Sequence, residues 1–133
     1  MSTADSAKCY LANSVNTASP GRLTLMLYDG GIRFMATAVA GFEEPDPVKR
    51  IETIHNNLVK AQNILRELQS ALDLNGAGGF SERMFALYDY MIAQLAEANR
   101  KKEAQPIQLV EELLGKIRNA WATMLAPSES VAA

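Results

Sequence analysis

The chain has 133 residues, of which 48% are hydrophobic and 21% are charged, and its formal net charge is −2. These proportions are ordinary for a single globular domain with its own core, and they argue against a disordered chain. The weakly acidic balance, without a dense basic cluster, argues against a nucleic-acid partner. The single Cys9 cannot form an internal disulfide, and no segment has the pattern of a secretory signal or a membrane span. We therefore expect a cytosolic protein without direct membrane insertion.

The N-terminal region divides into a short polar segment and a long helix. Residues 1–16 are weakly patterned, and we expect a flexible arm there. Ser19 followed by Pro20 is typical of a helix start, which predicts a helix over about 20–42. Its apolar residues form two neighbouring stripes rather than one, so more than one side must be covered. We expect this helix to be central and flanked by the others.

Three further helices are predicted from the spacing of apolar residues. Asp46 and Pro47 begin a helix over 47–73, Ser81 is the expected cap of a helix over 81–101, and a helix over 106–125 ends before Pro127. Each carries a seam of apolar residues at alternating three- and four-residue steps. The seams include Ile51 and Leu72 in the first of these helices, Met84 and either Leu87 or Tyr88 in the second, and Ile117 and Trp121 in the third. With no alternating strand pattern, the sequence predicts an all-α, antiparallel four-helix bundle over residues 17–126. Residues 127–133 are expected to be a disordered tail.

Catalytic chemistry finds little support in the sequence. Glu52 and His55 have the Glu-x-x-His spacing of metal-binding bundles, but a complete site needs a second such motif, and the chain has one histidine. His55 is also the candidate for an alternative function, a helical histidine phosphotransfer domain, although Leu58 and Val59 occupy the positions one turn beyond it. Cys9 lies on the expected flexible arm, and no second histidine is available to pair with a serine. We expect no catalysis, no metal and no cofactor.

Binding of an apolar partner is a better-supported function. Amide and cationic side chains lie beside the apolar seam of the second helix, and tyrosines lie beside that of the third. Amide groups can bond an incoming backbone while apolar neighbours bury its side chains. For each residue taken singly, however, a place in the core or on the solvated surface is the more frequent role. The pattern therefore favours a peptide-binding surface without establishing one.

The chain also resembles a known family, that of the flagellar secretion chaperone FliS. The resemblance covers roughly Tyr10 to Trp121 and rests on several short motifs in order. These stand here as Asn13-Ser14-Val15, Thr17-Ala18-Ser19-Pro20, Leu25-Met26-Leu27-Tyr28-Asp29-Gly30, Arg33-Phe34, Lys60-Ala61-Gln62-Asn63-Ile64, Glu67-Leu68, Leu87-Tyr88-Asp89-Tyr90-Met91, Ala98-Asn99 and Ile117-Arg118.

The resemblance implies a bundle that binds the disordered C-terminal segment of flagellin in the bacterial cytosol. It implies that binding prevents premature polymerisation and that the complex is delivered to the export gate of the flagellar type III apparatus. A flagellar regulator such as an anti-sigma factor is a further implied partner. As a hypothesis, the arm around Tyr10 covers part of the groove when no client is bound. We assign client binding to Tyr10, Tyr28, Arg33, Asn57, Lys60, Ala61, Gln62, Ile64, Tyr88, Tyr90, Met91 and Asn99.

Overall fold

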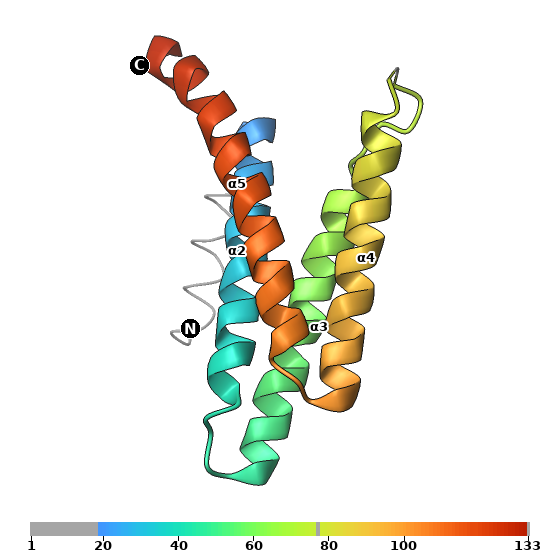
Figure 1. Cartoon of the computed structure of the whole chain (residues 1–133). Coiled ribbons are helices and arrows are strands. Elements are labelled where there is room, and N and C mark those ends of the chain that lie inside the picture. The colour runs from blue at the N-terminus through green and yellow to red at the C-terminus, as the bar shows by residue number, and fades with distance from the viewer. Residues whose placement is uncertain (1–18, 77, 133) are drawn as a thin grey trace, which may run out of the picture.

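A computed structural model describes residues 19–76 and 78–132, with side chains described as far as Ala126. Its helices are α2 (Pro20–Gly41), α3 (Pro47–Ser70), α4 (Phe80–Lys101) and α5 (Gln105–Ala132), and the described residues contain no strand. Short connections turn each helix back along its predecessor (Figure 1). The predicted all-α four-helix bundle is confirmed. None of the described helices is both long enough and apolar enough to cross a bilayer.

Two of the three predicted helix caps are confirmed. The Ser19 hydroxyl accepts a hydrogen bond from the Arg22 backbone N–H at 3.2 Å, and the Asp46 carboxylate accepts one from Val48 at 2.9 Å. Each bond satisfies a backbone donor that the first helical turn leaves free. The prediction for Ser81 is wrong, because α4 begins one residue earlier and its N-cap is Gly79, with φ +72°. A glycine adopts this left-handed conformation without steric cost.

The prediction that the last helix ends before Pro127 is also wrong. The backbone of α5 continues through Pro127 to Ala132, so the segment expected to be a disordered tail is helical as far as residue 132. The fixed φ of proline is compatible with a helix, and what it removes is one N–H bond to the carbonyl four residues earlier. Thr123, which carries that carbonyl, is exposed. Water can therefore hydrate the unpaired oxygen, which reduces the cost of the missing bond.

The four helices pack as a ring in the order α2, α3, α4, α5, with α5 returning to α2. The expectation that the first helix is flanked by all three others is therefore only partly confirmed. It packs extensively against α3 and α5, whereas α4 lies diagonally across the core. Figure 1 shows that the bundle is narrow where α2 connects to α3, and that the pair α2 and α5 diverges from the pair α3 and α4 toward the opposite end.

The core follows the predicted seams. The sequence left Leu87 and Tyr88 as alternatives for one inward position, and the structure buries Tyr88, which is 2% exposed. Ile51 departs from its predicted seam and is exposed, because it lies near the N-terminus of α3, which extends past the ends of the neighbouring helices (Figure 1). The largest fully buried side chains are Tyr88, Met35, Ile54, Leu58, Leu65, Met91, Leu95, Ile107, Leu114 and Val110.

Candidate functional site

The apolar seams of three helices lose their cover toward the wide end of the bundle. On α5, Val110 and Leu114 are fully buried, but Trp121 is only partly buried. On α4 the change runs from fully buried Leu95 to Phe80, which is 62% exposed. Along α3 the seam stays buried as far as Leu68, and Leu72, two residues beyond the end of the helix, is only partly buried. We call this region the open end, with partly buried seam residues Leu72, Met84, Ile117 and Trp121.

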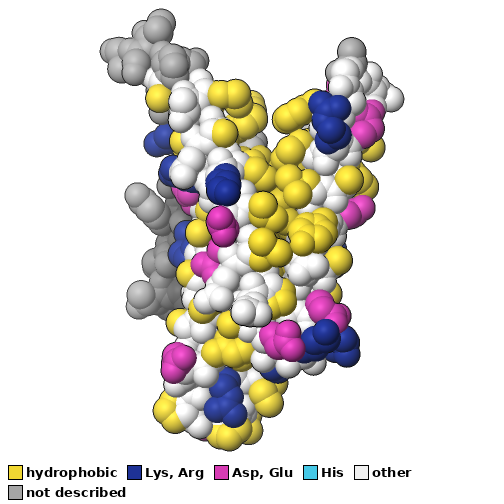
Figure 2. Space-filling model, viewed as in Figure 1, with side chains coloured by type: hydrophobic (Ala, Val, Ile, Leu, Met, Phe, Trp, Pro, Cys, Tyr) yellow, Lys and Arg dark blue, Asp and Glu magenta, His cyan; other side chains and the backbone are white. Residues whose placement is uncertain are grey.

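The open end forms an apolar depression on the molecular surface. Figure 2 shows hydrophobic side chains gathered between the diverging α4 and α5, in a hollow that narrows toward the far end of the bundle. Phe80 and Met124 belong to the two helices at this end and are among the most exposed large hydrophobic residues described. A surface of this shape and chemistry suits the apolar side of a helix or an extended segment.

A pair of tyrosines lies where the closed core meets the open end. The hydroxyl oxygens of Tyr28 on α2 and Tyr88 on α4 are 2.9 Å apart and form a buried hydrogen bond. Burial raises the pKa of both hydroxyls. The Trp121 ring packs edge-on against Tyr28 with ring centroids 6.3 Å apart, and its Nε1–H donates to the Gly21 carbonyl at 2.8 Å. These contacts fix the aromatic groups below the apolar hollow.

Hydrogen bonds of polar side chains join α3 to α4, on the side of α4 that faces away from α5. Gln62 donates from Nε2 to the Ile92 carbonyl at 3.1 Å, and Gln69 donates to the Phe85 carbonyl at 3.0 Å. His55 is bonded to Asn99 through Nδ1 and Nδ2, 2.9 Å apart. His55, Gln62 and Gln69 are seven residues apart along α3. Their partners on α4, Asn99, Ile92 and Phe85, have the same spacing in the opposite direction, because the two helices are antiparallel. We call these bonds the polar ladder.

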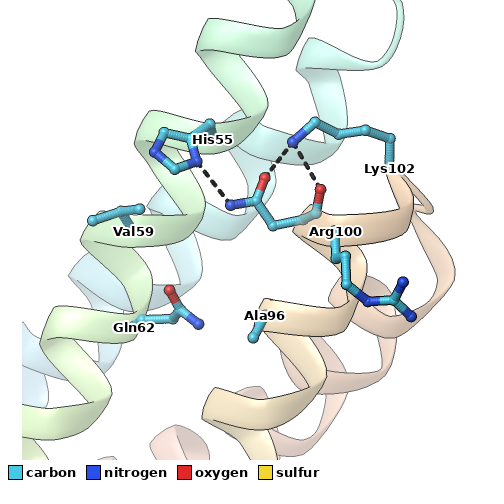
Figure 3. A pocket seen from close by; sticks show the side chains of 7 residues that line it. His55, Val59, Gln62, Ala96, Arg100 and Lys102 are labelled. Atoms are coloured by element: carbon cyan, nitrogen blue, oxygen red, sulfur yellow. Dashed lines mark hydrogen bonds between the residues drawn. The ribbon is translucent and has the colours of Figure 1, made fainter.

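At its His55–Asn99 end, the polar ladder borders a cavity of about 400 Å³ between α3 and α4. In Figure 3, His55 and Gln62 reach toward it from one helix, and Lys102 from the C-terminus of the other. The Lys102 ammonium group donates to the Asn99 carbonyl at 2.8 Å and to its amide oxygen. Burial lowers the Lys102 pKa. Because Asn99 bonds both His55 and Lys102, these polar groups beside the cavity already have partners, and we interpret the cavity as part of the α3–α4 contact.

A second surface lies on the face shared by α2 and α3. Two cationic groups lie over the Phe34 ring, with the Arg33 Cζ 5.7 Å and the Lys60 Nζ 5.5 Å from its centroid. Gly30 lets the two helices approach here, since a Cβ at this position would be 3.1 Å from Cδ1 of Ile64 and 3.8 Å from Nη2 of Arg33. We call Arg33, Phe34 and Lys60 the cationic patch.

The structure divides the predicted client-binding residues into three groups. Tyr28, Ala61, Tyr88 and Met91 are buried in the core, and Tyr10 lies outside the described residues. Gln62 and Asn99 belong to the polar ladder. The accessible members are Arg33, Asn57, Lys60, Ile64 and Tyr90, and of these Asn57 donates to the Thr53 carbonyl of its own helix. The predicted residues thus do not form one continuous exposed surface in this conformation.

The apolar residues of the open end were not among the predicted site residues. Met84, Ile117 and Trp121 had been assigned to the seams, because their spacing is the same as that of the core residues. Their different burial depends on how far the helices diverge, which the spacing does not reveal. Phe80 is the one residue with a local signal, since a phenylalanine directly after a glycine-rich loop is easily left exposed.

Comparisons with known proteins point to a single family. Residues 2–128 match the family described as "Flagellar protein FliS". A protein of Bacillus subtilis named flagellar secretion chaperone FliS is 43% identical over 112 residues, which span 84% of this chain and 80% of the relative. The protein of the same name in Salmonella typhimurium is 37% identical over 126 residues, spanning 91% and 90%. That of Vibrio cholerae is 30% identical over 115 residues, spanning 86% and 81%.

Proposed function

This chain belongs to the FliS family of flagellar proteins, whose named members are flagellar secretion chaperones, and we propose that it acts as the export chaperone of flagellin. In this proposal it binds the disordered C-terminal segment of flagellin in the cytosol and prevents premature polymerisation. The loaded complex then reaches the export gate of the flagellar type III apparatus. An anti-sigma factor or another flagellar regulator is a second partner of the same kind.

The observation that best supports this proposal is the joint loss of burial along three seams at the open end. A bundle that served only as a structural unit would gain stability by closing these seams over Trp121 and Met84. The exposed apolar hollow is instead suited to the apolar side chains of a segment that folds when it binds. The ordering cost of such a segment lowers its net affinity, so that it can still be released for export.

The alternative function, histidine phosphotransfer, is not supported. The relatives are named as chaperones, and the His55 ring is hydrogen-bonded to Asn99 within the polar ladder. A phosphoryl group on Nδ1 of His55 would have to displace the Asn99 amide. It would therefore break the hydrogen bond of the polar ladder that lies nearest the closed end of the bundle.

Calorimetric titration with a peptide from the C-terminal end of the cognate flagellin tests the function. We expect saturable binding with a Kd in the micromolar range or below. To locate the site, Phe80 and Met84 at the open end are both replaced by serine, which should weaken binding at least about tenfold, because apolar surface is lost.

The matched control replaces Val48 and Ile51, two exposed apolar residues at the closed end of the bundle, by serine. This variant should bind the peptide like the unmodified protein. The thermal midpoint of both variants is measured as well, since Met84 is partly buried. Equal weakening by the two pairs of substitutions would place the client elsewhere, and an absence of saturable binding to the unmodified protein would defeat the function itself.

A further inference from the structure

We propose that the cationic patch on the α2–α3 face binds an acidic stretch of the client segment. The inference rests on the proposed function and adds to it the chemistry of a second contact, away from the apolar open end. It concerns the side of the ring of helices that faces away from α4 and α5.

The first argument is that the two cations of the patch have no carboxylate partner. Four cationic side chains on the bundle are paired with carboxylates: Arg100 and Lys101 with Glu97, Lys116 with Glu112, and Arg118 with Asp29. Arg50, Arg66, Arg83 and Lys102 donate instead to backbone or amide oxygens. Arg33 and Lys60 lie together over one ring, and no carboxylate of the described residues is within ion-pair distance of either. Both are exposed. In a chain with net charge −2, two neighbouring cations without a carboxylate form a local positive site.

The second argument is that the patch is already arranged. Attraction to the Phe34 ring holds both cationic groups near one point, which reduces the side-chain freedom that a partner would otherwise have to remove. An approaching carboxylate therefore meets two oriented donors.

The third argument concerns the kind of partner. A guanidinium binds a carboxylate through two parallel hydrogen bonds, and a neighbouring ammonium adds a second charge-assisted donor. The half-buried Phe34 and Ile64 beside them can cover an aliphatic or aromatic side chain. The chemistry thus fits a peptide with aspartate or glutamate next to an apolar residue.

The test compares two variants that lose the same charge. Arg33 and Lys60 are both replaced by glutamine, and the control replaces Lys49 and Lys101, two exposed cations near the closed end, by glutamine. The titrant is the flagellin C-terminal peptide at low and at high salt. We expect the patch variant to bind about three- to tenfold more weakly at low salt, the size of two exposed ion pairs. The difference should largely vanish at about 1 M salt, where charges are screened beyond about 3 Å.

A second peptide, with its aspartates and glutamates changed to asparagine and glutamine, completes the cycle. It should bind the unmodified protein more weakly than the acidic peptide does, while the patch variant should not distinguish the two peptides. Equal weakening by both glutamine variants would reduce the effect to net charge and overturn the inference, as would unchanged binding by the patch variant. Either result leaves the proposed function intact if the unmodified protein binds the peptide; if it does not, both fall.

Discussion

The hydroxyl groups of Tyr28 and Tyr88 bond each other across the core, 2.9 Å apart, although 60 residues separate them in the chain. Other hydrogen bonds act within each pair of neighbouring helices. Asp29 with Arg118 and Gly21 with Trp121 join α2 to α5, and the polar ladder joins α3 to α4. The tyrosine pair thus connects one pair of helices to the other, at the boundary between the closed core and the open end.

This relationship predicts strong non-additivity between two substitutions. Tyr28→Phe or Tyr88→Phe alone removes one hydroxyl and leaves the other buried without its partner, which should cost about 1–3 kcal/mol of unfolding free energy. The double variant removes both hydroxyls and should lie close to the unmodified protein, since no polar group is left unsatisfied. Urea unfolding of the three variants measures the cycle.

Tyr90→Phe is the matched control, because this tyrosine is exposed and its loss should change stability by less than about 0.5 kcal/mol. If the two core substitutions were simply additive, the hydrogen bond would not be the reason for their effect.

The same pair predicts sensitivity to alkaline pH. The pKa values of Tyr28 and Tyr88 are raised above their ordinary value by burial, so the folded state favours the neutral hydroxyls. Their contribution to stability is complete below the pKa of an unfolded tyrosine, about 10. It is lost as the pH rises from there toward the folded values, because the unfolded chain then releases protons that the folded protein retains.

The measurement is the urea midpoint between pH 8 and pH 11 for the unmodified protein and the double phenylalanine variant. Other groups titrate in this range in both proteins, so the difference between the two curves carries the result. We expect it to be constant below about pH 10 and then to favour the double variant. Parallel curves throughout would show that the pair does not govern alkaline stability.

Two glycines in helices should respond oppositely to alanine. No heavy atom lies within 4 Å of a Cβ placed on Gly115, so Gly115→Ala should stabilise α5 by about 0.5–1 kcal/mol. A Cβ on Gly31 would lie 3.2 Å from Cδ2 of Leu114 and 3.3 Å from Cγ2 of Ile64. Overpacking of this kind costs about 1–3 kcal/mol, so Gly31→Ala should lose the gain or reverse it. The thermal midpoints of the two variants measure this difference in stability. An equal gain at both positions would contradict the close packing of α2 against α3 and α5.

The fold was largely predictable because its determinants are local or periodic. The spacing of Leu58 and Leu65 and the caps at Ser19 and Asp46 act over one or two helical turns. The site was less predictable because its determinants depend on the register between helices. Gln62 was predicted to bond a client backbone, yet the structure uses it to bond the Ile92 carbonyl. No periodicity within α3 alone distinguishes these two uses.

Tyr88 illustrates the same limit at one position. Its spacing fitted the seam no better than that of Leu87, and a buried hydroxyl needs a partner, which lies in a helix two elements earlier. The extent of α5 had a different cause. Proline usually ends a helix inside a protein, but the Thr123 residue whose carbonyl loses its partner is exposed to water, and the sequence did not show that this helix projects beyond its neighbours (Figure 1).

The polar ladder has a consequence for motion. Its bonds from His55, Gln62 and Gln69 repeat every two helical turns, so sliding α3 along α4 by a single turn would break all of them together. The polar ladder therefore stabilises α3 and α4 against sliding and favours their movement as a pair. A widening of the open end that keeps these bonds is a rotation of α3 and α4 together about the connections at residues 42–46 and 102–104, and it works against the Tyr28–Tyr88 hydrogen bond.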